Sequence, residues 1–406
     1  MSGAARVLER CAQLSAISEE SGRLTRRFGT EAMRDANALV GGWMEEAGLA
    51  AREDELGNLI GRRGDGPVLM VGSHLDTVID AGRYDGPLGV LVAIEAAERV
   101  PRDLEVAGFA DEEGVRFGTA YLGSSALAGR FDLGWLELRD REGVRLGDLV
   151  RGVPAARDDV LGYVEVHIEQ GPALERLDEP VGVVTAIAGQ SHAMLTFTGE
   201  AGHAGTVPMD ARRDALAAAA EWVLAVERAG GTVGRLDVEP GVRNVIPAAA
   251  TATLDLRDPD DAARHARLAG LRDEATTIAR RRGVDVAWID TGDVAAVAMD
   301  ERLSAAFGVD VRLPCGAGHD AAMMAHIAPA AMLFVRCAGG ISHNPAESVE
   351  EADVAVALDA LERLLRDVSP AHPRRLRGAP QGGAGHRRRG DQRRDDRRHR
   401  PRPEGS

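Results

Sequence analysis

Five short segments of the chain concentrate side chains that could bind metal ions or move protons. They are GSHLDTV (72–78), GRYDGPLGV (82–90), FADEEGVRFG (109–118), EVHIEQGP (165–172) and GGISHNPAE (339–347). Each segment follows a predicted strand or lies in a glycine-rich loop, and sites in open α/β sheets form beyond the carboxyl ends of strands. Their histidines and carboxylates form a ligand set compatible with Zn²⁺, Mn²⁺, Co²⁺ or Ni²⁺.

Each candidate ligand also has an ordinary structural explanation when it is taken alone. His74 could bind a metal while Asp76 fixes its tautomer, or the pair could be common loop polarity. Asp85 could bridge two cations, or it could cap the helix that is predicted to begin near Pro87. His167 could be a histidine bonded within the core, and His343 an exposed loop histidine.

Glu112 and Glu113 are adjacent carboxylates, which repel each other unless a positive charge lies near them. A metal ion that holds Glu113 would relieve this repulsion and leave Glu112 free to take a proton from an attacking water. The alternative is a solvated acidic turn. The five ligand candidates and Glu112 are therefore informative as a set rather than singly.

Hydrophobic periodicity indicates the elements that must position these segments. Short apolar runs at 68–72 and 105–110 predict buried strands, and helices are predicted at 32–46, 87–100 and 124–130. This alternation is typical of an α/β protein with a covered, mostly parallel sheet.

The middle of the chain has a different pattern, which predicts a smaller α+β unit. Its elements are expected at 193–199 (strand), 215–229 (helix), 242–258 (strand), 262–282 (helix) and 284–290 (strand). We therefore expect a discontinuous domain of residues 1–190 and 301–370, with a domain of residues 191–300 inserted into it.

Composition limits the classes of function. The net charge of −15 argues against nucleic acid as a partner, and no apolar stretch is long enough to cross a membrane. Three widely spaced cysteines suit a reducing, cytoplasmic location. The Arg-rich segment 373–406 has too few apolar residues to form a core and is expected to be disordered; the alternative is a basic arm that binds nucleic acid or a membrane.

The motifs, in this order, resemble the amidohydrolase branch of the co-catalytic zinc aminopeptidase-type superfamily. This branch includes allantoate amidohydrolases, N-carbamoyl-L-amino-acid hydrolases and β-ureidopropionases. The resemblance covers roughly residues 20–365 and is carried by EVHIEQGP, GEAGHAGTVPMDARRDAL (199–216), GAGHDA (316–321) and GGISHNPAE. It implies a zinc-aminopeptidase-like catalytic domain and an inserted, ferredoxin-like lid or dimerisation domain.

The resemblance also implies a role for each matching residue. His74, Asp85 and His167 would bind one divalent ion, and Asp85, Glu113 and His343 a second. The implied catalytic residues are Glu112 as general acid and base, Asp76, and His203 as the oxyanion-stabilising group, often supplied across a homodimer. The implied substrate-binding residues are Gln170, Asn244, Arg257, Gly318 and His319.

The expected reaction is hydrolysis of a ureido C–N bond in a small carboxylate substrate. Allantoate is favoured because DTVIDAGRYDGPLGV and SHNPAE resemble allantoate amidohydrolases slightly better than carbamoylases. An N-carbamoyl-L-amino acid is the second candidate, followed by β-ureidopropionate. A peptidase and a non-catalytic binding protein are further alternatives. Cys315, His192 and the short segment 293–314 depart from the family pattern, which affects the expected fit of the substrate more than metal binding.

Overall fold

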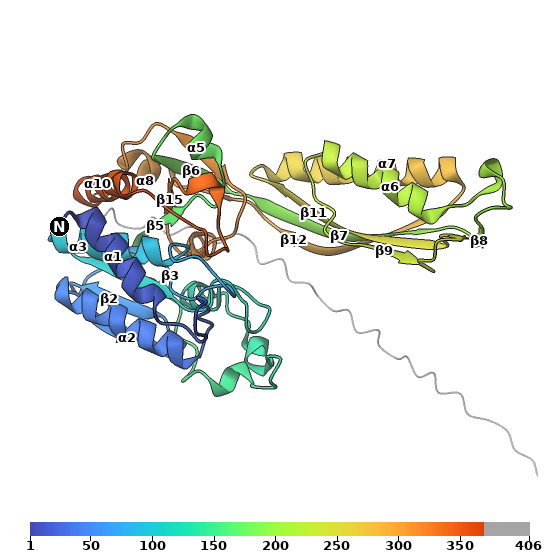
Figure 1. Ribbon diagram of the computed structural model, residues 1–406. Helices are drawn as coiled ribbons and strands as arrows, with labels where there is room; N and C mark the ends of the chain where they lie inside the picture. Colours follow the sequence, from blue (N-terminus) through green and yellow to red (C-terminus); the bar gives the residue numbers. More distant parts are fainter. Residues whose placement is uncertain (369–406) are drawn as a thin grey trace, which may run out of the picture. The chain divides into compact units, whose positions relative to one another are not determined.

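The N-terminal and C-terminal parts of the described chain together form a nine-stranded mixed sheet (Figure 1). The computed structural model describes residues 1–368, so the segment 373–406 lies outside the described residues. The strands are β1 (Ala50–Glu53), β2 (Leu59–Arg63), β3 (Val68–His74), β4 (Leu104–Phe109), β5 (Val160–Ile168), β6 (Val181–Ile187), β13 (Val297–Ala298), β14 (Arg312–Cys315) and β15 (Ala330–Val335).

The strand order is β1-β2-β4-β3-β5-β15-β6-β13, with β14 beside β6. The four strands β4, β3, β5 and β15 are mutually parallel, whereas β1, β2 and β13 pair antiparallel with their neighbours. Because the four parallel strands run in one direction, their carboxyl ends lie along the same edge of the sheet. The predicted α/β class with a mostly parallel sheet is confirmed.

Helices cover both faces of this sheet. Alternate strand residues point to opposite faces, so Leu69 and Val71 pack into one core while Met70 packs into another. The first core is closed by α1 (Gly3–Ser15), α2 (Glu31–Glu46), α3 (Pro87–Arg99), α8 (Glu301–Ala306) and α10 (Glu351–Asp367). On the opposite face, α9 (Asp320–Met324) packs on β5 and β15 and is in contact with α4 (Leu122–Leu127).

A second sheet of four antiparallel strands is formed by the middle of the chain. It has the order β12-β7-β11-β9, with β7 (Gly189–Thr198), β9 (Leu236–Glu239), β11 (Ala249–Asp258) and β12 (Asp285–Val294). The helices α6 (Ala215–Arg228) and α7 (Asp261–Arg282) pack against it, which gives the β-α-β-β-α-β order of ferredoxin-like units. The domain boundaries at 190 and 300 stay a prediction.

Two predicted elements differ from the observed ones. The strand expected at 242–258 is interrupted: β10 (Val245–Ile246) pairs with β8 (Gly202–His203), and β11 begins only after Pro247, which has no N–H to continue a ladder. The helix expected at 124–130 runs instead from Leu122 to Leu127, and it ends before Gly129, which has a φ of 67°.

The remaining elements are short. They are α5 (Ala173–Leu177) and the 3₁₀ turns η1 (Leu133–Glu137), η2 (Leu146–Asp148), η3 (Met209–Ala211) and η4 (Ala338–Gly340). Across residues 1–368, the helices are too short or too polar for any of them to cross a membrane.

Replacing Trp222 with Ala tests whether the second sheet unfolds on its own. Trp222 is fully buried, and its Nε1 donates to the carbonyl of Leu271 at 3.1 Å, so we expect the free energy of unfolding to fall by about 3–5 kcal/mol. In hydrogen exchange, faster exchange should be confined to residues 189–294. Leu224→Ala on the same helix is the control, because Leu224 is 54% exposed and should change stability by less than about 0.5 kcal/mol. Equal loss of protection in β3 and β5 would contradict a separate inserted domain.

Candidate metal centre and substrate pocket

The candidate ligands lie at the carboxyl ends of the four parallel strands. His74 is the last residue of β3, His167 is the last but one of β5, and Glu112 and Glu113 follow β4 after a two-residue step. His343 follows β15 in a loop and has a left-handed backbone, with a φ of 55°. Parallel pairing of these strands is what brings residues so distant in the sequence to one place.

Asp85 is the residue that the three histidines share. Its Oδ1 lies 3.6 Å from His74 Nε2 and 3.2 Å from His167 Nε2, and its Oδ2 lies 3.4 Å from His343 Nε2. Asp85 precedes α3, but the N-cap position belongs to Gly86 and no side chain caps this helix. The carboxylate therefore faces the histidines rather than the helix N-terminus.

The imidazole rings are oriented so that their Nε2 atoms point inward. His74 Nδ1 lies 3.0 Å from the carbonyl oxygen of Asp76, and His167 Nδ1 lies 2.9 Å from that of Ile168. A ring whose Nδ1–H donates to a carbonyl presents a lone pair on Nε2, which is the tautomer a metal ligand needs.

The donor set fits two divalent cations. The potential ligand atoms of His74, Asp85 and His167 lie within 4.8 Å of one another, and so do those of Asp85, Glu113 and His343. Asp85 Oδ1 and His167 Nε2 are buried and have no hydrogen-bond partner among the described residues. Nitrogen and carboxylate donors with unused lone pairs match the preferences of Zn²⁺ and Mn²⁺. Which residues bind metal stays a prediction.

The carboxylate of Asp76 connects the loop after β3 to the loop after β4. Its Oδ1 and Oδ2 accept hydrogen bonds from the backbone N–H groups of Glu112 and Glu113, each at 3.1 Å. The same carboxylate lies 3.6 Å from His74 Nδ1. Asp76 thus contacts both His74 and the two adjacent glutamates, which is more than the tautomer-fixing contact that the sequence suggested.

Arg26, in the N-terminal segment, is hydrogen-bonded to the loop after β3. Its guanidinium is fully buried and donates to the backbone carbonyls of Leu75, Leu14 and Ile17 at 2.8, 3.1 and 3.0 Å. Burial lowers the pKa of Arg26 to about 10, which still leaves it charged at neutral pH. It places a fixed positive charge behind the acidic side chains of the site.

Glu112 lies beside the ligand set without a close ion pair of its own. Its Oε2 is 3.9 Å from His74 Nε2, and burial raises its pKa well above the usual range of a glutamate. A cavity of about 210 Å³ opens beside it. The lining residues are His74, Asp85, Glu112, Glu113, Ala120, Tyr121, His167, Gln170, Arg257, Ala317, Gly318, His319 and His343.

Four predicted substrate-binding residues line this cavity. Gln170 donates from Nε2 to Asp85 Oδ2 at 2.8 Å, and Gly318 and His319 come from the loop before α9. The ring nitrogens of His319 are buried and have no hydrogen-bond partner among the described residues. Arg257 pairs through Nε and Nη2 with Asp255 and donates from Nη1 to the carbonyl of Gly316 at 2.8 Å.

The structure does not bring His203 and Asn244 to this cavity. His203 lies on β8, which pairs with β10, and both side chains are exposed at the far end of the small sheet. Arg257 pairs with Gln190 at one end of the β7–β11 ladder, and Ala249 pairs with Thr198 at the other. Eight residues of strand separate these ends by roughly 27 Å, so neither residue can reach the cavity of its own chain.

Two residues of the site were missed by the sequence reasoning. Glu347 accepts hydrogen bonds from the backbone N–H groups of Tyr84 and Asp85 at 2.6 and 3.1 Å, and it thereby fixes the position of Asp85. Its place in SHNPAE could have identified it. Tyr121 lines the cavity, but no motif in the sequence marks it.

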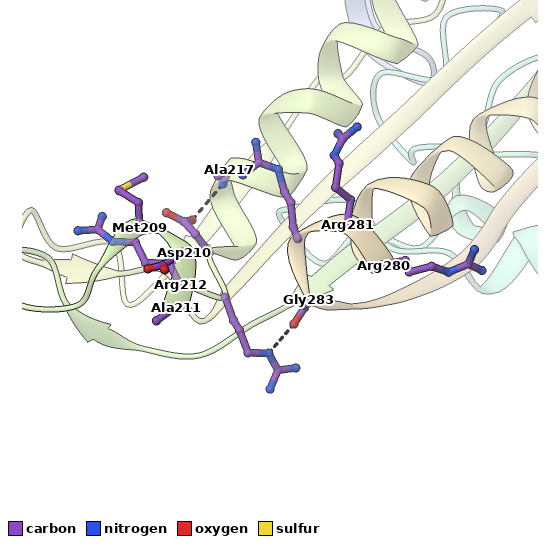
Figure 2. Close-up of a pocket in the computed structure, with 11 residues that line it drawn as sticks. Met209, Asp210, Ala211, Arg212, Ala217, Arg280, Arg281 and Gly283 are labelled. Carbon is purple, nitrogen blue, oxygen red and sulfur yellow. Dashed lines mark hydrogen bonds between the residues drawn. The ribbon is translucent and has the colours of Figure 1, made fainter.

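A cavity of about 450 Å³ lies elsewhere, between residues 209–217 and 280–283 of the small sheet unit (Figure 2). Arginines dominate its lining, but Figure 2 shows the side chains of Arg280 and Arg281 pointing in different directions. Arg213 donates to the carbonyl of Gly283. Because the guanidinium groups do not converge, this cavity lacks the arrangement of a binding site, and the centre around Asp85 remains the candidate functional site.

Comparison with known proteins finds relatives that are similar over most of the chain. Allantoate deiminase of Arabidopsis thaliana is 38% identical over 412 residues, covering 85% of this chain and 78% of the relative. N-carbamoyl-L-amino acid amidohydrolase of Geobacillus stearothermophilus is 39% identical over 393 residues, covering 88% of this chain and 96% of the relative.

The fold is shared with a solved structure, the amidase of the hydantoinase/carbamoylase family from Burkholderia multivorans. That structure has a TM-score of 0.84 and 33% sequence identity, and the match covers 89% of this chain and 97% of that one. The model of peptidase family M20/M25/M40 matches residues 70–367. The resemblance read from the motifs is confirmed, and this chain belongs to peptidase family M20/M25/M40.

Proposed function

We propose that this protein is a metal-dependent amidohydrolase that cleaves a ureido C–N bond of a small carboxylate substrate, with allantoate as the first candidate. The observation that carries the proposal is the placement of Glu112 beside two overlapping ligand groups, in a cavity that also contains Arg257. A proton-transfer group, a potential ion centre and a carboxylate-binding group are the parts that this reaction needs.

His74, Asp85 and His167 would hold one divalent ion, and Asp85, Glu113 and His343 the other. Zn²⁺ or Mn²⁺ is the expected metal, with Co²⁺ or Ni²⁺ as alternatives. When bound, such a pair of ions lowers the pKa of a water and polarises the carbonyl that is attacked. Asp85 would be the shared ligand because each of its two oxygens faces a different histidine group.

Glu112 would act twice in the reaction. As a carboxylate it takes a proton from the water that attacks the ureido carbonyl, and as a carboxylic acid it gives that proton to the leaving nitrogen. Its buried position and the hydrogen bond from its backbone N–H to Asp76 hold it in place for both transfers. Cleavage of a terminal ureido group releases ammonia, carbon dioxide and an amine fragment.

Arg257 would bind the substrate carboxylate, with Gln170, Gly318 and His319 lining the rest of the cavity. A guanidinium can bind a carboxylate through two parallel hydrogen bonds. Because Nε and Nη2 already contact Asp255, a substrate carboxylate would bind at Nη1 or replace Asp255.

A second copy of the chain would complete the site. His203 and Asn244 are exposed at the end of the small sheet that lies farthest from Arg257, so a homodimer can place them over the cavity of the partner. There His203 would donate to the oxygen on which negative charge develops. We also propose a cytoplasmic location, in keeping with three free, buried cysteines.

An N-carbamoyl-L-amino acid is the second candidate substrate. The Geobacillus stearothermophilus relative that is named for this activity is 39% identical, as close as the relatives named for allantoate. Both substrates carry a ureido group and a carboxylate. The two substrates differ in the third substituent on the carbon that carries both of these groups, so the cavity must distinguish them by that substituent.

Removal of metal tests the ion centre. Dialysis against a chelator should abolish hydrolysis of allantoate, and addition of Mn²⁺, Zn²⁺, Co²⁺ or Ni²⁺ should restore it, because the bound ions would activate the attacking water. Activity and elemental composition are measured on the same samples. Full turnover in excess chelator, with no metal in the protein, would contradict the proposal.

Replacing Glu112 with Gln tests its role in proton transfer. We expect turnover to fall by about 10²–10⁴-fold, the range for a general acid or base, while metal content is retained. Glu113→Gln is the matched control, and it should lose metal because Glu113 is a proposed ligand. If Glu112→Gln loses metal and Glu113→Gln keeps it, the two roles are reversed.

Mixing two inactive variants tests whether His203 acts across a dimer. His203→Ala should lower the rate by about 10²–10³-fold, as for loss of one oxyanion donor. A mixed dimer of His203→Ala and Glu112→Gln chains has one site with both wild-type residues, so partial activity should return on mixing. No recovery despite confirmed subunit exchange would show that His203 does not act on a partner chain.

A further inference from the structure

Tyr121 has a backbone conformation that an aromatic residue rarely adopts. Its φ of 63° and ψ of 33° lie in the left-handed region, directly before α4. A bulky side chain with positive φ is an outlier, and such residues cluster at functional sites where the surrounding structure holds them. Contacts with neighbouring segments must therefore hold Tyr121 in this conformation.

Hydrogen bonds join the start of α4 to residues 110–112, which form the loop after β4. The backbone N–H groups of Tyr121, Leu122 and Gly123 donate to the carbonyls of Glu112, Asp111 and Ala110 at 3.2, 3.3 and 2.8 Å. A Cβ on Gly123 would lie 2.6 Å from the backbone nitrogen of Ala110, so the two segments are in close contact. Tyr121 is thus fixed in position relative to Glu112.

The phenol of Tyr121 extends into the same cavity as Glu112 and Arg257. It passes over Gly318 so closely that a Cβ at Gly318 would lie 1.8 Å from the phenol oxygen and 3.0 Å from Cζ. Because Gly318 has no side chain, the phenol oxygen of Tyr121 can occupy this space.

This phenol is a donor without a partner in the described part of the chain. No hydrogen bond from its hydroxyl is present among residues 1–368, whereas the hydroxyl of Tyr163 donates to the carbonyl of Gly72 at 3.0 Å. Burial raises the pKa of Tyr121, so the group stays protonated. It can donate to a substrate, but it cannot serve as a base at neutral pH.

We propose that Tyr121 is a specificity-determining residue, whose hydroxyl donates to an acceptor oxygen on the substrate arm that is neither the carboxylate nor the cleaved ureido group. The inference rests on the proposed function, in which Arg257 holds the carboxylate and Glu112 serves the cleaved group. Allantoate carries a second ureido oxygen on that arm, whereas an N-carbamoyl amino acid with an apolar side chain does not. Tyr121 is half-buried, so its hydroxyl can stay hydrated when the latter substrate binds, and only allantoate gains the hydrogen bond.

Tyr121→Phe tests the inference, because it removes the oxygen and keeps the ring. We expect kcat/KM for allantoate to fall by about 3–10-fold, mainly through KM, which is the effect of one neutral hydrogen bond. For N-carbamoyl-L-leucine, kcat/KM should stay within about twofold. Tyr163→Phe is the matched control: Tyr163 donates to the carbonyl of Gly72 at 3.0 Å and does not line the cavity, so its loss should affect both substrates equally.

Binding to the Glu112→Gln protein separates this inference from the proposed function, because it requires no turnover. Calorimetry should show that adding Tyr121→Phe weakens binding of allantoate and leaves N-carbamoyl-L-leucine unchanged. Equal weakening of both ligands, or of neither, would overturn the role of Tyr121 whatever the activity. If the wild-type protein binds the ligands with this selectivity but hydrolyses neither, the proposed function fails and the inference stands.

Gly318→Ala tests the contact itself without any substrate. In the wild-type background the new Cβ would overlap the phenol oxygen, so we expect a lower melting temperature. In the Tyr121→Phe background the nearest remaining atom is Cζ, at 3.0 Å, so most of this loss should be recovered. Equal destabilisation in both backgrounds would show that Tyr121 does not lie over Gly318 in solution.

Discussion

The structure depends on negative charge that is buried at the carboxyl edge of the parallel strands. Asp76, Asp85 and Glu112 are each no more than 7% exposed, and Glu113 is beside them. Burying unpaired charge is costly, and the buried guanidinium of Arg26, which lies against the loop after β3, donates to carbonyls rather than to these carboxylates. The inward Nε2 atoms of His74 and His167 and the unpartnered Oδ1 of Asp85 are what a pair of cations would satisfy.

Much of the fold could be predicted because its helices and buried strands have clear periodicity. The predicted helix at 32–46 and strand at 68–72 correspond closely to α2 and β3. The break between β10 and β11 was missed because the apolar pattern continues through Pro247, whereas the pairing of Val245 with His203 is a long-range contact. The antiparallel strands β1 and β2 lack a strong pattern of their own; β2 depends on pairing with β4, and the edge strand β1 depends on pairing with β2.

The candidate site could be predicted wherever a ligand-type residue follows a strand of the parallel set. Parallel pairing then brings His74, Glu113 and His167 together without further information. The position of His203 could not be predicted in this way, because it depends on a different sheet and, in our proposal, on a second chain. Tyr121 was missed because the role that we propose for it depends on two close contacts, with Glu112 and with Gly318, that no local pattern encodes.

The central claim is that Asp85 lies between two metal ions. Anomalous diffraction from crystals of the metal-loaded protein, recorded at the absorption edge of the bound metal, tests it most directly. We predict two peaks, one on each side of the Asp85 carboxylate, with His74 and His167 beside one and Glu113 and His343 beside the other. A single peak, or peaks that do not contact Asp85, would contradict this account.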